Sequence, residues 1–263
     1  MLTIKQYVRP ETLDEAYTLC QKRGNVVLGG MLWLKMENLN VNTVIDLSGL
    51  GLDTIQETDT EFTIGAMVSL RQLETHPGLN DYTGGCMGSC VAPIVGVQFR
   101  NLATIGGRLW GKFGFSDPLT LFLALGAKLR LHGLGEVSLA DWLKMSAVRD
   151  ILTHVVIPKT PCTVAYLSQR NTATDFPVLT CAVCRRGEKI VCAVGARPSR
   201  AALFTADNAL WENGITEQSA RAFAEQVAET AGFGSNMRAS AEYRKTICRV
   251  LVRRAVLQLA KEN

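Results

Sequence analysis

Two Gly-Gly pairs are the residues of this chain whose type and spacing best suit phosphate chemistry. Gly29 and Gly30 follow a short β-branched run, Val26 to Leu28, and Gly106 and Gly107 end the apolar segment FRNLATIGG. Residues without a Cβ let backbone N–H groups come close to a phosphate. One such pair is more often only a tight turn. Two pairs on one chain predict a clamp on a diphosphate, and therefore a dinucleotide cofactor.

Short strands and helices must hold these pairs in place. Thr12 to Glu15 form a capping box before a helix that ends near Gly24, and strands are expected at 26–28 and 44–47, on either side of the first pair. Further expected elements are strands at 63–66, 127–132 and 151–157, a helix capped by Ser69 and Gln72, and a helix at 118–125.

A proline-rich joint, Pro158 to Pro161, divides the chain. After it the pattern changes to antiparallel strands and then helices. We expect strands at 163–169, 177–185 and 188–195, and helices at 201–211, 216–231 and 238–261. The whole chain is therefore predicted to be α+β, with one domain before the joint and another after it.

Composition narrows the class of protein. The 263 residues are 47% hydrophobic and 20% charged, which is typical of a globular chain with a substantial core. The net charge of +4 is too small to predict a nucleic-acid partner. No apolar run approaches the roughly 20 residues that span a bilayer, and the N-terminus lacks the apolar region of a signal peptide. We expect neither nucleic-acid binding nor a membrane span.

The eight cysteines form no disulfide or metal framework. Cys181 and Cys184 have CxxC spacing but lie in a β-like run, and Cys86 and Cys90 have no matching second pair. No metal site is therefore expected in this chain. Free thiols in a reducing cytoplasm are the interpretation that fits best.

Six segments, in order along the chain, carry a family resemblance. They are VVLGGMLWLK (26–35), TVIDLSGL (43–50), FTIGAMVSLRQLE (62–74), FRNLATIGG (99–107), SDPLTLFLALGAKL (116–129) and SAEYRKTICRVLVRRAV (240–256). Together they resemble the FAD-binding medium subunit of the xanthine dehydrogenase / carbon monoxide dehydrogenase family of molybdenum hydroxylases. The resemblance implies a FAD-binding domain of the PCMH type at 1–158, with subdomains at about 1–50 and 51–158. It also implies a C-terminal medium-subunit domain at 162–263, with a three-stranded antiparallel sheet and a helical bundle.

The resemblance also implies which residues hold FAD. In the first loop the backbone of Gly29, Gly30, Met31, Leu32, Trp33 and Leu34 would meet one phosphate. The family usually has polar residues after this glycine pair, so Met31 and Leu32 remove side-chain hydrogen bonds. Core packing is the alternative interpretation of Trp33.

In the second loop Thr104, Ile105, Gly106 and Gly107 match the family's TIGG residues. Thr104 would offer its hydroxyl, and the two glycines their N–H groups, to the diphosphate or ribityl chain. Asn is common at the next position, where this chain has Arg108. That arginine would either neutralise a phosphate or block the cleft.

Three further positions follow from the matched segments. Asp117 corresponds to the family acid that contacts the sugar portion of FAD, although Asp before Pro is also a good N-cap. Ile94 and Leu152 fall beside the flavin or adenine, and plain core packing is their alternative. A family lysine near Leu167 is absent, with Arg170 close by. No histidine lies in either glycine loop, so FAD is expected to bind non-covalently.

The function implied by the resemblance is electron transfer, with no catalytic residue in this chain. FAD would take electrons from [2Fe-2S] clusters on a small subunit, supplied by a large molybdopterin-binding subunit, and pass them to NAD⁺ or another acceptor. The chain alone would be inactive toward the organic substrate. The alternatives are a stand-alone flavin reductase and an assembly subunit that has lost flavin. A Rossmann protein is disfavoured because no GxGxxG opens a helix after the first strand.

Overall fold

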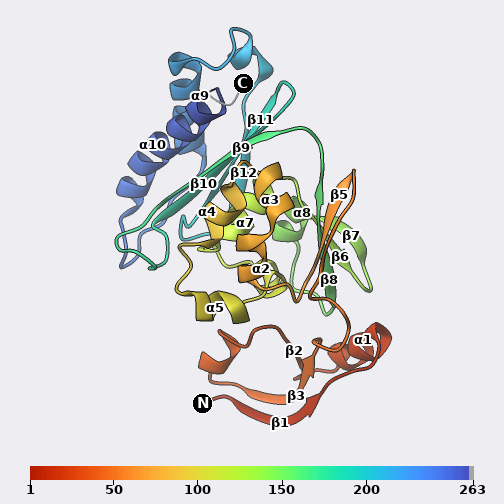
Figure 1. Cartoon of the computed structure of the whole chain (residues 1–263). Helices are drawn as coiled ribbons and strands as arrows, with labels where there is room; N and C mark the ends of the chain where they lie inside the picture. Colours follow the sequence, from red (N-terminus) through yellow and green to blue (C-terminus); the bar gives the residue numbers. More distant parts are fainter. Residues whose placement is uncertain (261–263) are drawn as a thin grey trace.

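Three parallel strands form a small sheet at the N-terminal end of the molecule (Figure 1), in a computed structural model that describes residues 1–260. The sheet has the order β1-β3-β2. Its elements along the chain are β1 (Thr3–Val8), α1 (Leu13–Gln21), β2 (Val26–Leu28), η1 (Leu34–Met36) and β3 (Asn40–Asp46). Helix α1 begins at the predicted capping box, where the Glu15 N–H donates to Thr12 Oγ1 at 3.1 Å. Because β2 runs directly into Gly29, this sheet sets the position of the first glycine pair.

Five antiparallel strands form the second sheet, in the order β4-β5-β8-β6-β7. They are β4 (Ile55–Glu57), β5 (Glu61–Gly65), β6 (Lys128–Leu131), β7 (Gly135–Ser138) and β8 (Leu152–Pro158). The helices between β5 and β8 along the chain are α2 (Leu70–Thr75), α3 (Pro77–Tyr82), α4 (Cys86–Val91), α5 (Val97–Leu102), α6 (Ile105–Trp110), α7 (Asp117–Ala124) and α8 (Leu139–Lys144). The predicted Ser69–Gln72 capping box is present at the start of α2.

The C-terminal sheet has four antiparallel strands rather than the predicted three, in the order β12-β11-β10-β9. Its elements are β9 (Thr163–Gln169), β10 (Leu179–Arg186), β11 (Lys189–Gly195), β12 (Ala202–Thr205), η2 (Asn208–Trp211), α9 (Glu217–Thr230) and α10 (Ala241–Leu259). The helix predicted at 201–211 is wrong, because residues 202–205 pair with β11 as a strand and only residues 208–211 form a short 3-10 helix. Phe204 packs toward α9 and α10 while Leu203 is exposed, which is the alternation of a strand. Position 261, the predicted end of the last helix, lies outside the described residues.

The two faces of the C-terminal sheet join different cores. Cys181, Val183, Cys192 and Val194 pack with α9 and α10, whereas Ala182 and Cys184 of the same strand β10 belong to the core that contains α7. Every residue of α7 is buried. The C-terminal sheet therefore closes the core of the central part of the chain, and α7 is fixed on both sides.

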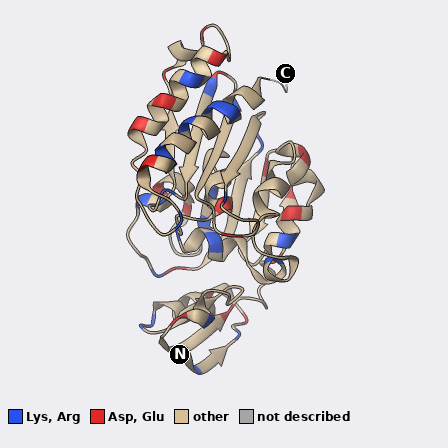
Figure 2. Cartoon of the chain, turned by 90° about the vertical axis from the view of Figure 1, so that its left-hand side faces the viewer, with Lys and Arg blue, Asp and Glu red and all other residues tan. Residues whose placement is uncertain are grey.

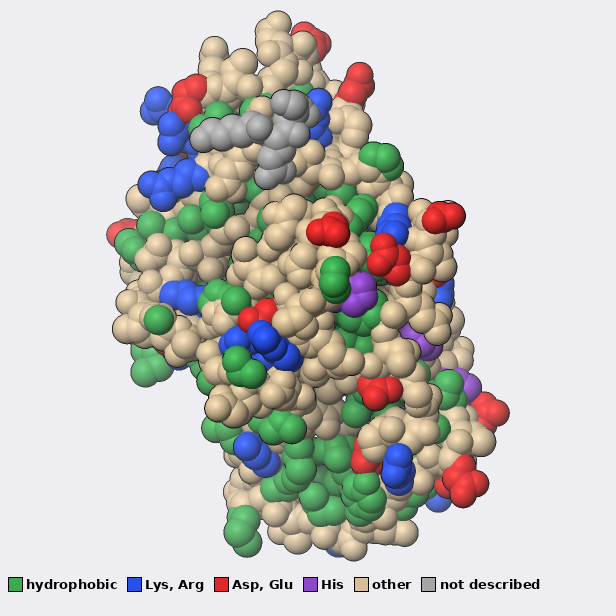
Figure 3. Space-filling model, viewed as in Figure 1, with side chains coloured by type: hydrophobic (Ala, Val, Ile, Leu, Met, Phe, Trp, Pro, Cys, Tyr) green, Lys and Arg blue, Asp and Glu red, His purple; other side chains and the backbone are tan. Residues whose placement is uncertain are grey.

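The surface carries two features visible in the figures. Acidic and basic residues lie side by side on α9 and α10 (Figure 2), where Arg249 pairs with Glu225 and Glu229. Hydrophobic side chains gather over the N-terminal sheet on the face shown in Figure 3. Within residues 1–260, no helix combines the length and the apolar character needed to cross a bilayer.

Candidate cofactor site

The two glycine segments lie against each other in the structure. A Cβ on Gly29 would come within 2.8 Å of Thr104 Oγ1, and a Cβ on Gly30 would overlap with the carbonyl group of Leu102. The missing side chains therefore allow the N-terminal sheet to approach the segment between α5 and α6. This contact brings together two segments that are more than 70 residues apart in the sequence.

The first loop offers backbone donors. Among residues 1–260, no acceptor is found for the N–H groups of Gly29, Gly30, Met31 and Leu32, whereas the Lys35 N–H donates to the carbonyl of Met31. Met31 has a φ of 59°, a left-handed conformation that is uncommon for a residue with a side chain. The loop thus holds several consecutive amides available to an anion.

The second glycine pair lies in a helix and not in the predicted turn. Thr104 is the N-cap of α6, and its Oγ1 accepts from the Gly107 N–H at 3.2 Å. The N–H groups of Ile105 and Gly106 donate to the carbonyls of Val68 and Ala66, each at 2.9 Å. These three amides are therefore engaged within the protein, so the N–H groups of Gly106 and Gly107 do not face the diphosphate as expected. Thr104 can still offer its hydroxyl proton, and its own N–H has no acceptor among residues 1–260.

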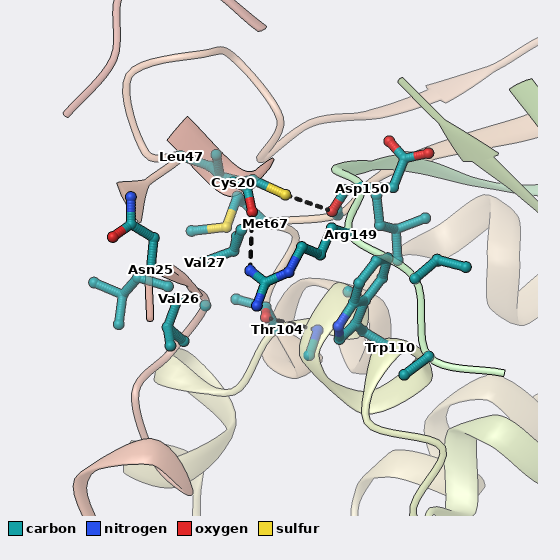
Figure 4. Close-up of a pocket in the computed structure, with 18 residues that line it drawn as sticks. Cys20, Asn25, Val26, Val27, Leu47, Met67, Thr104, Trp110, Arg149 and Asp150 are labelled. Carbon is teal, nitrogen blue, oxygen red and sulfur yellow. Dashed lines mark hydrogen bonds between the residues drawn. The ribbon is translucent and has the colours of Figure 1, made fainter. Parts of the chain in front are cut away.

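Three cavities share Gly29 and Thr104 in their linings. The Arg149 cavity, of about 450 Å³, extends toward Cys20, Arg149 and Asp150 (Figure 4). The Arg108 cavity, of about 290 Å³, extends toward Trp33 and Phe113, and the Asp46 cavity, of about 390 Å³, toward Asp46, Ser69 and Asn101. Each has the size of a small-molecule pocket. Together they offer an extended space on several sides of the glycine contact, as a long dinucleotide requires.

Most of the predicted site residues line these cavities. The Arg149 cavity includes Gly29, Thr104, Gly106, Gly107 and Leu152. The Arg108 cavity includes Gly29, Gly30, Met31, Leu32, Trp33, Leu34, Thr104, Gly107 and Arg108. A smaller space of about 110 Å³, the Asp117 cavity, is lined by Trp33, Ile94, Arg108 and Asp117. Ile105 is fully buried in the core and lines none of the described cavities.

Asp117 has a different local role from the N-cap considered for it. Ser116 caps α7, with its Oγ accepting from the Leu119 N–H at 3.3 Å, and Asp117 is the first helical residue. Asp117 is buried, and its Oδ1 accepts from the Tyr166 hydroxyl at 2.6 Å and from the Arg170 guanidinium. Within residues 1–260, no donor is found for Oδ2. The carboxylate is thus held in place while one oxygen is still able to accept a hydrogen bond.

Arg149 and Trp110 also line the Arg149 cavity, and no sequence pattern indicated either residue. The Arg149 guanidinium donates to the carbonyls of Cys20 and Lys22, at 3.2 and 3.1 Å, and lies between α1 and the Thr104 segment (Figure 4). Arg149 comes from the loop before β8 and has no motif around it. The long-range contact that places it carries no local sequence signal.

Two observations support a fit to FAD. The glycine pair at 29–30 forms a cradle that a Cβ would fill, with free amides along the following residues. In addition, the buried Nε1 of Trp33 has no acceptor, although this indole lines the Arg108 cavity. Buried donors without a partner are few in folded proteins, and two of the four such atoms among residues 1–260, Trp33 Nε1 and Arg170 Nε, belong to residues that line the Asp117 cavity.

Comparison with known proteins places the chain in a family. Residues 3–160 match the family described as the FAD binding domain in molybdopterin dehydrogenase, and residues 165–259 match the CO dehydrogenase flavoprotein C-terminal domain. The nicotine 6-hydroxylase medium subunit of Paenarthrobacter nicotinovorans is 23% identical over 274 residues, with 96% of each chain covered.

Solved structures share the fold. Quinoline 2-oxidoreductase from Pseudomonas putida 86 has a TM-score of 0.85 at 19% identity, covering 99% of this chain and 98% of that one. Carbon monoxide dehydrogenase from Hydrogenophaga pseudoflava has a TM-score of 0.87 at 21% identity, covering 97% of each chain.

These matches define the class of protein as an oxidoreductase subunit. The chain belongs to the family of FAD-binding domains of molybdopterin dehydrogenases, as a medium subunit of the molybdenum hydroxylases.

Proposed function

We propose that this chain is the FAD-binding electron-transfer subunit of a xanthine dehydrogenase-like complex in the cytoplasm. In this proposal a large molybdopterin-binding subunit oxidises an organic substrate, and a small subunit with [2Fe-2S] clusters carries the electrons to this chain. FAD, held non-covalently, supplies the redox chemistry and passes the electrons to NAD⁺ or another acceptor. Residues 1–158 form the FAD-binding domain, and residues 162–263 form the C-terminal medium-subunit domain.

The observation that carries the proposal is the contact between the two glycine segments. Gly29 lies beside Thr104, and three cavities open from this point. The free amides of the first loop and the Thr104 hydroxyl are suited to a diphosphate, because backbone and hydroxyl donors bind phosphate oxygens without needing a charge. The chain's own residues thus bind and orient the cofactor, and none of them has to act as an acid or a base.

Visible spectroscopy of the purified chain tests this proposal. We expect flavin bands and, after heat denaturation, release of FAD into the supernatant. A preparation that lacks flavin should regain the bands when FAD is added. A colourless protein that stays without flavin at high FAD concentration would contradict the proposal and would favour an assembly subunit.

Activity measurements distinguish the proposed electron-transfer subunit from a stand-alone flavin reductase. The isolated chain should leave an N-heterocycle or an aldehyde unoxidised, and should recover the full reaction only with a molybdopterin subunit and an iron–sulfur subunit. Rapid NADH oxidation with a dye as acceptor, together with no co-purification of such subunits, would instead identify a stand-alone flavin reductase.

A further inference from the structure

Arg108 is a buried cation without a hydrogen bond or a close ion pair among residues 1–260. Only 6% of the residue is exposed, yet within residues 1–260 its guanidinium has no hydrogen bond or ion pair. The Phe99 ring lies 5.3 Å from its Cζ. Burial lowers the pKa of Arg108 to about 10, against the opposing effect of the Asp117 carboxylate. That carboxylate is already bound by Tyr166 and Arg170, so it does not fully compensate a second guanidinium.

The Trp33 indole lies at the same place. Both Arg108 and Trp33 line the Arg108 cavity and the Asp117 cavity. The Trp33 ring is fixed by Phe113, Phe115 and Phe176, whose centroids lie 5.9, 5.5 and 5.8 Å away. Its buried Nε1–H therefore points from a rigid position and lacks an acceptor. Arg108 and Trp33, from different parts of the chain, thus line the same two cavities.

The backbone adds further donors on the same cavity. Gly29 to Leu32 line the Arg108 cavity, and their N–H groups have no acceptor among residues 1–260. An unpaired buried guanidinium, a buried indole N–H and several free amides are together suited to an anion, because charged and neutral donors then share the oxygens of one group.

We infer that Arg108 and Trp33 form an anion subsite for the diphosphate of the cofactor, with Arg108 as the charged residue that replaces the polar side chains absent at Met31 and Leu32. The inference rests on the proposed FAD-binding function and deepens it. It selects phosphate neutralisation, and not obstruction of the cleft, as the role of Arg108. Affinity then depends on ionic strength, because one charge on the protein faces the charge of the diphosphate.

The test compares FAD and riboflavin, which has no phosphate, as ligands of the full chain freed of flavin. Dissociation constants are measured by flavin fluorescence at low and high salt for the wild type, Arg108→Gln and Arg108→Lys. We expect Arg108→Gln to weaken FAD binding by at least about tenfold at low salt. It should also reduce the salt dependence of FAD binding and leave the dissociation constant of riboflavin unchanged. Arg108→Lys should restore part of the affinity. The matched control is Lys35→Gln, which removes an exposed cation of the same loop and should change neither constant.

Two further variants separate binding from folding. Trp33→Phe keeps the ring and removes the N–H, and should weaken FAD by roughly fivefold. Arg108→Met should raise the melting temperature of the flavin-free chain, because an unpaired buried charge is removed. Addition of FAD should then raise the melting temperature of this variant by less than it raises that of the wild type.

Several results would overturn the inference. One is an unchanged FAD constant in Arg108→Gln, which would leave the proposed function intact. Another is an equal loss of FAD and riboflavin affinity, and a third is a lower melting temperature of flavin-free Arg108→Met, which would indicate a structural arginine. A wild-type chain that binds no FAD would overturn the proposed function together with the inference.

Discussion

Arg100 of α5 and Glu74 of α2 form a buried ion pair with two contacts. Arg100 Nε lies 2.8 Å from Glu74 Oε2, and Arg100 Nη2 lies 3.1 Å from Oε1. The same guanidinium donates to the carbonyl of Ile94 at 3.1 Å. Since α5 ends two residues before Thr104, this pair fixes the start of the second glycine segment.

Replacement of Arg100 by Met should lower the free energy of unfolding by about 3–5 kcal/mol, because it leaves a mostly buried carboxylate without its main partner. Chemical denaturation measures this loss. The matched control is Arg71→Ala, since Arg71 pairs with the same Glu74 but its side chain is 41% exposed. We expect a loss of at most about 1 kcal/mol in the control. Equal losses in the two variants would contradict the importance of the buried pair.

Stability should also depend on pH through Glu74. Burial acts to raise its pKa, but the hydrogen bonds from Arg100 and Arg71 outweigh burial and lower the pKa below its ordinary value of 4.5. A lowered pKa in the folded state means that the contribution is complete above about pH 4.5 and is lost as the pH falls through the folded-state value. The stability difference between wild type and Glu74→Gln should therefore shrink in acid. A difference that grows below pH 4 would refute this assignment.

Gly30→Ala should separate the two glycine segments. Its Cβ would overlap with the backbone carbonyl of Leu102, which cannot move as a side chain can. We expect a loss of FAD binding together with a lower melting temperature. Gly96→Ala serves as the control, because its Cβ would meet only the flexible side chain of Gln98. Normal FAD binding by Gly30→Ala would show that the close contact is dispensable.

Thr104→Val tests the hydroxyl donor of the second segment. The Gly107 N–H loses its acceptor, which should cost about 1 kcal/mol of stability as for other N-caps. FAD affinity should fall by roughly fivefold, because the hydroxyl no longer donates. Thr104→Ser retains the hydroxyl and should behave as the wild type in FAD titrations. If Thr104→Ser and Thr104→Val weaken FAD binding equally, the hydroxyl does not contact the cofactor.

Much of the fold could be predicted where a local signal exists. The helix expected at 216–231 is α9, Glu217–Thr230, with Thr216 and Ser219 forming a capping box. The segment 77–102 gave no such signal, and it forms the six-residue helices α3, α4 and α5. Helices this short gain little from propensity and are stabilised by tertiary packing, so the sequence alone does not reveal them.

The residues of the candidate site could likewise be predicted only where a local sequence signal exists. The first glycine pair could be recognised in the sequence, because the close approach of Gly30 to the Leu102 carbonyl requires a residue without a Cβ. The hydrogen bonds around the second pair could not be predicted, since the amides of Ile105 and Gly106 donate to the distant residues Val68 and Ala66. Arg149 was missed because contacts with residues more than 120 positions away determine its place.

Hydrogen exchange of the backbone amides, with and without FAD, tests the central claim most directly. In the flavin-free chain the amides of Gly30, Met31 and Leu32 should exchange fast, because they have no acceptor among residues 1–260. On FAD binding they should become protected, while α9 and α10 stay unchanged. FAD binding that leaves these three amides fast would contradict the account, since the cofactor would then lie elsewhere.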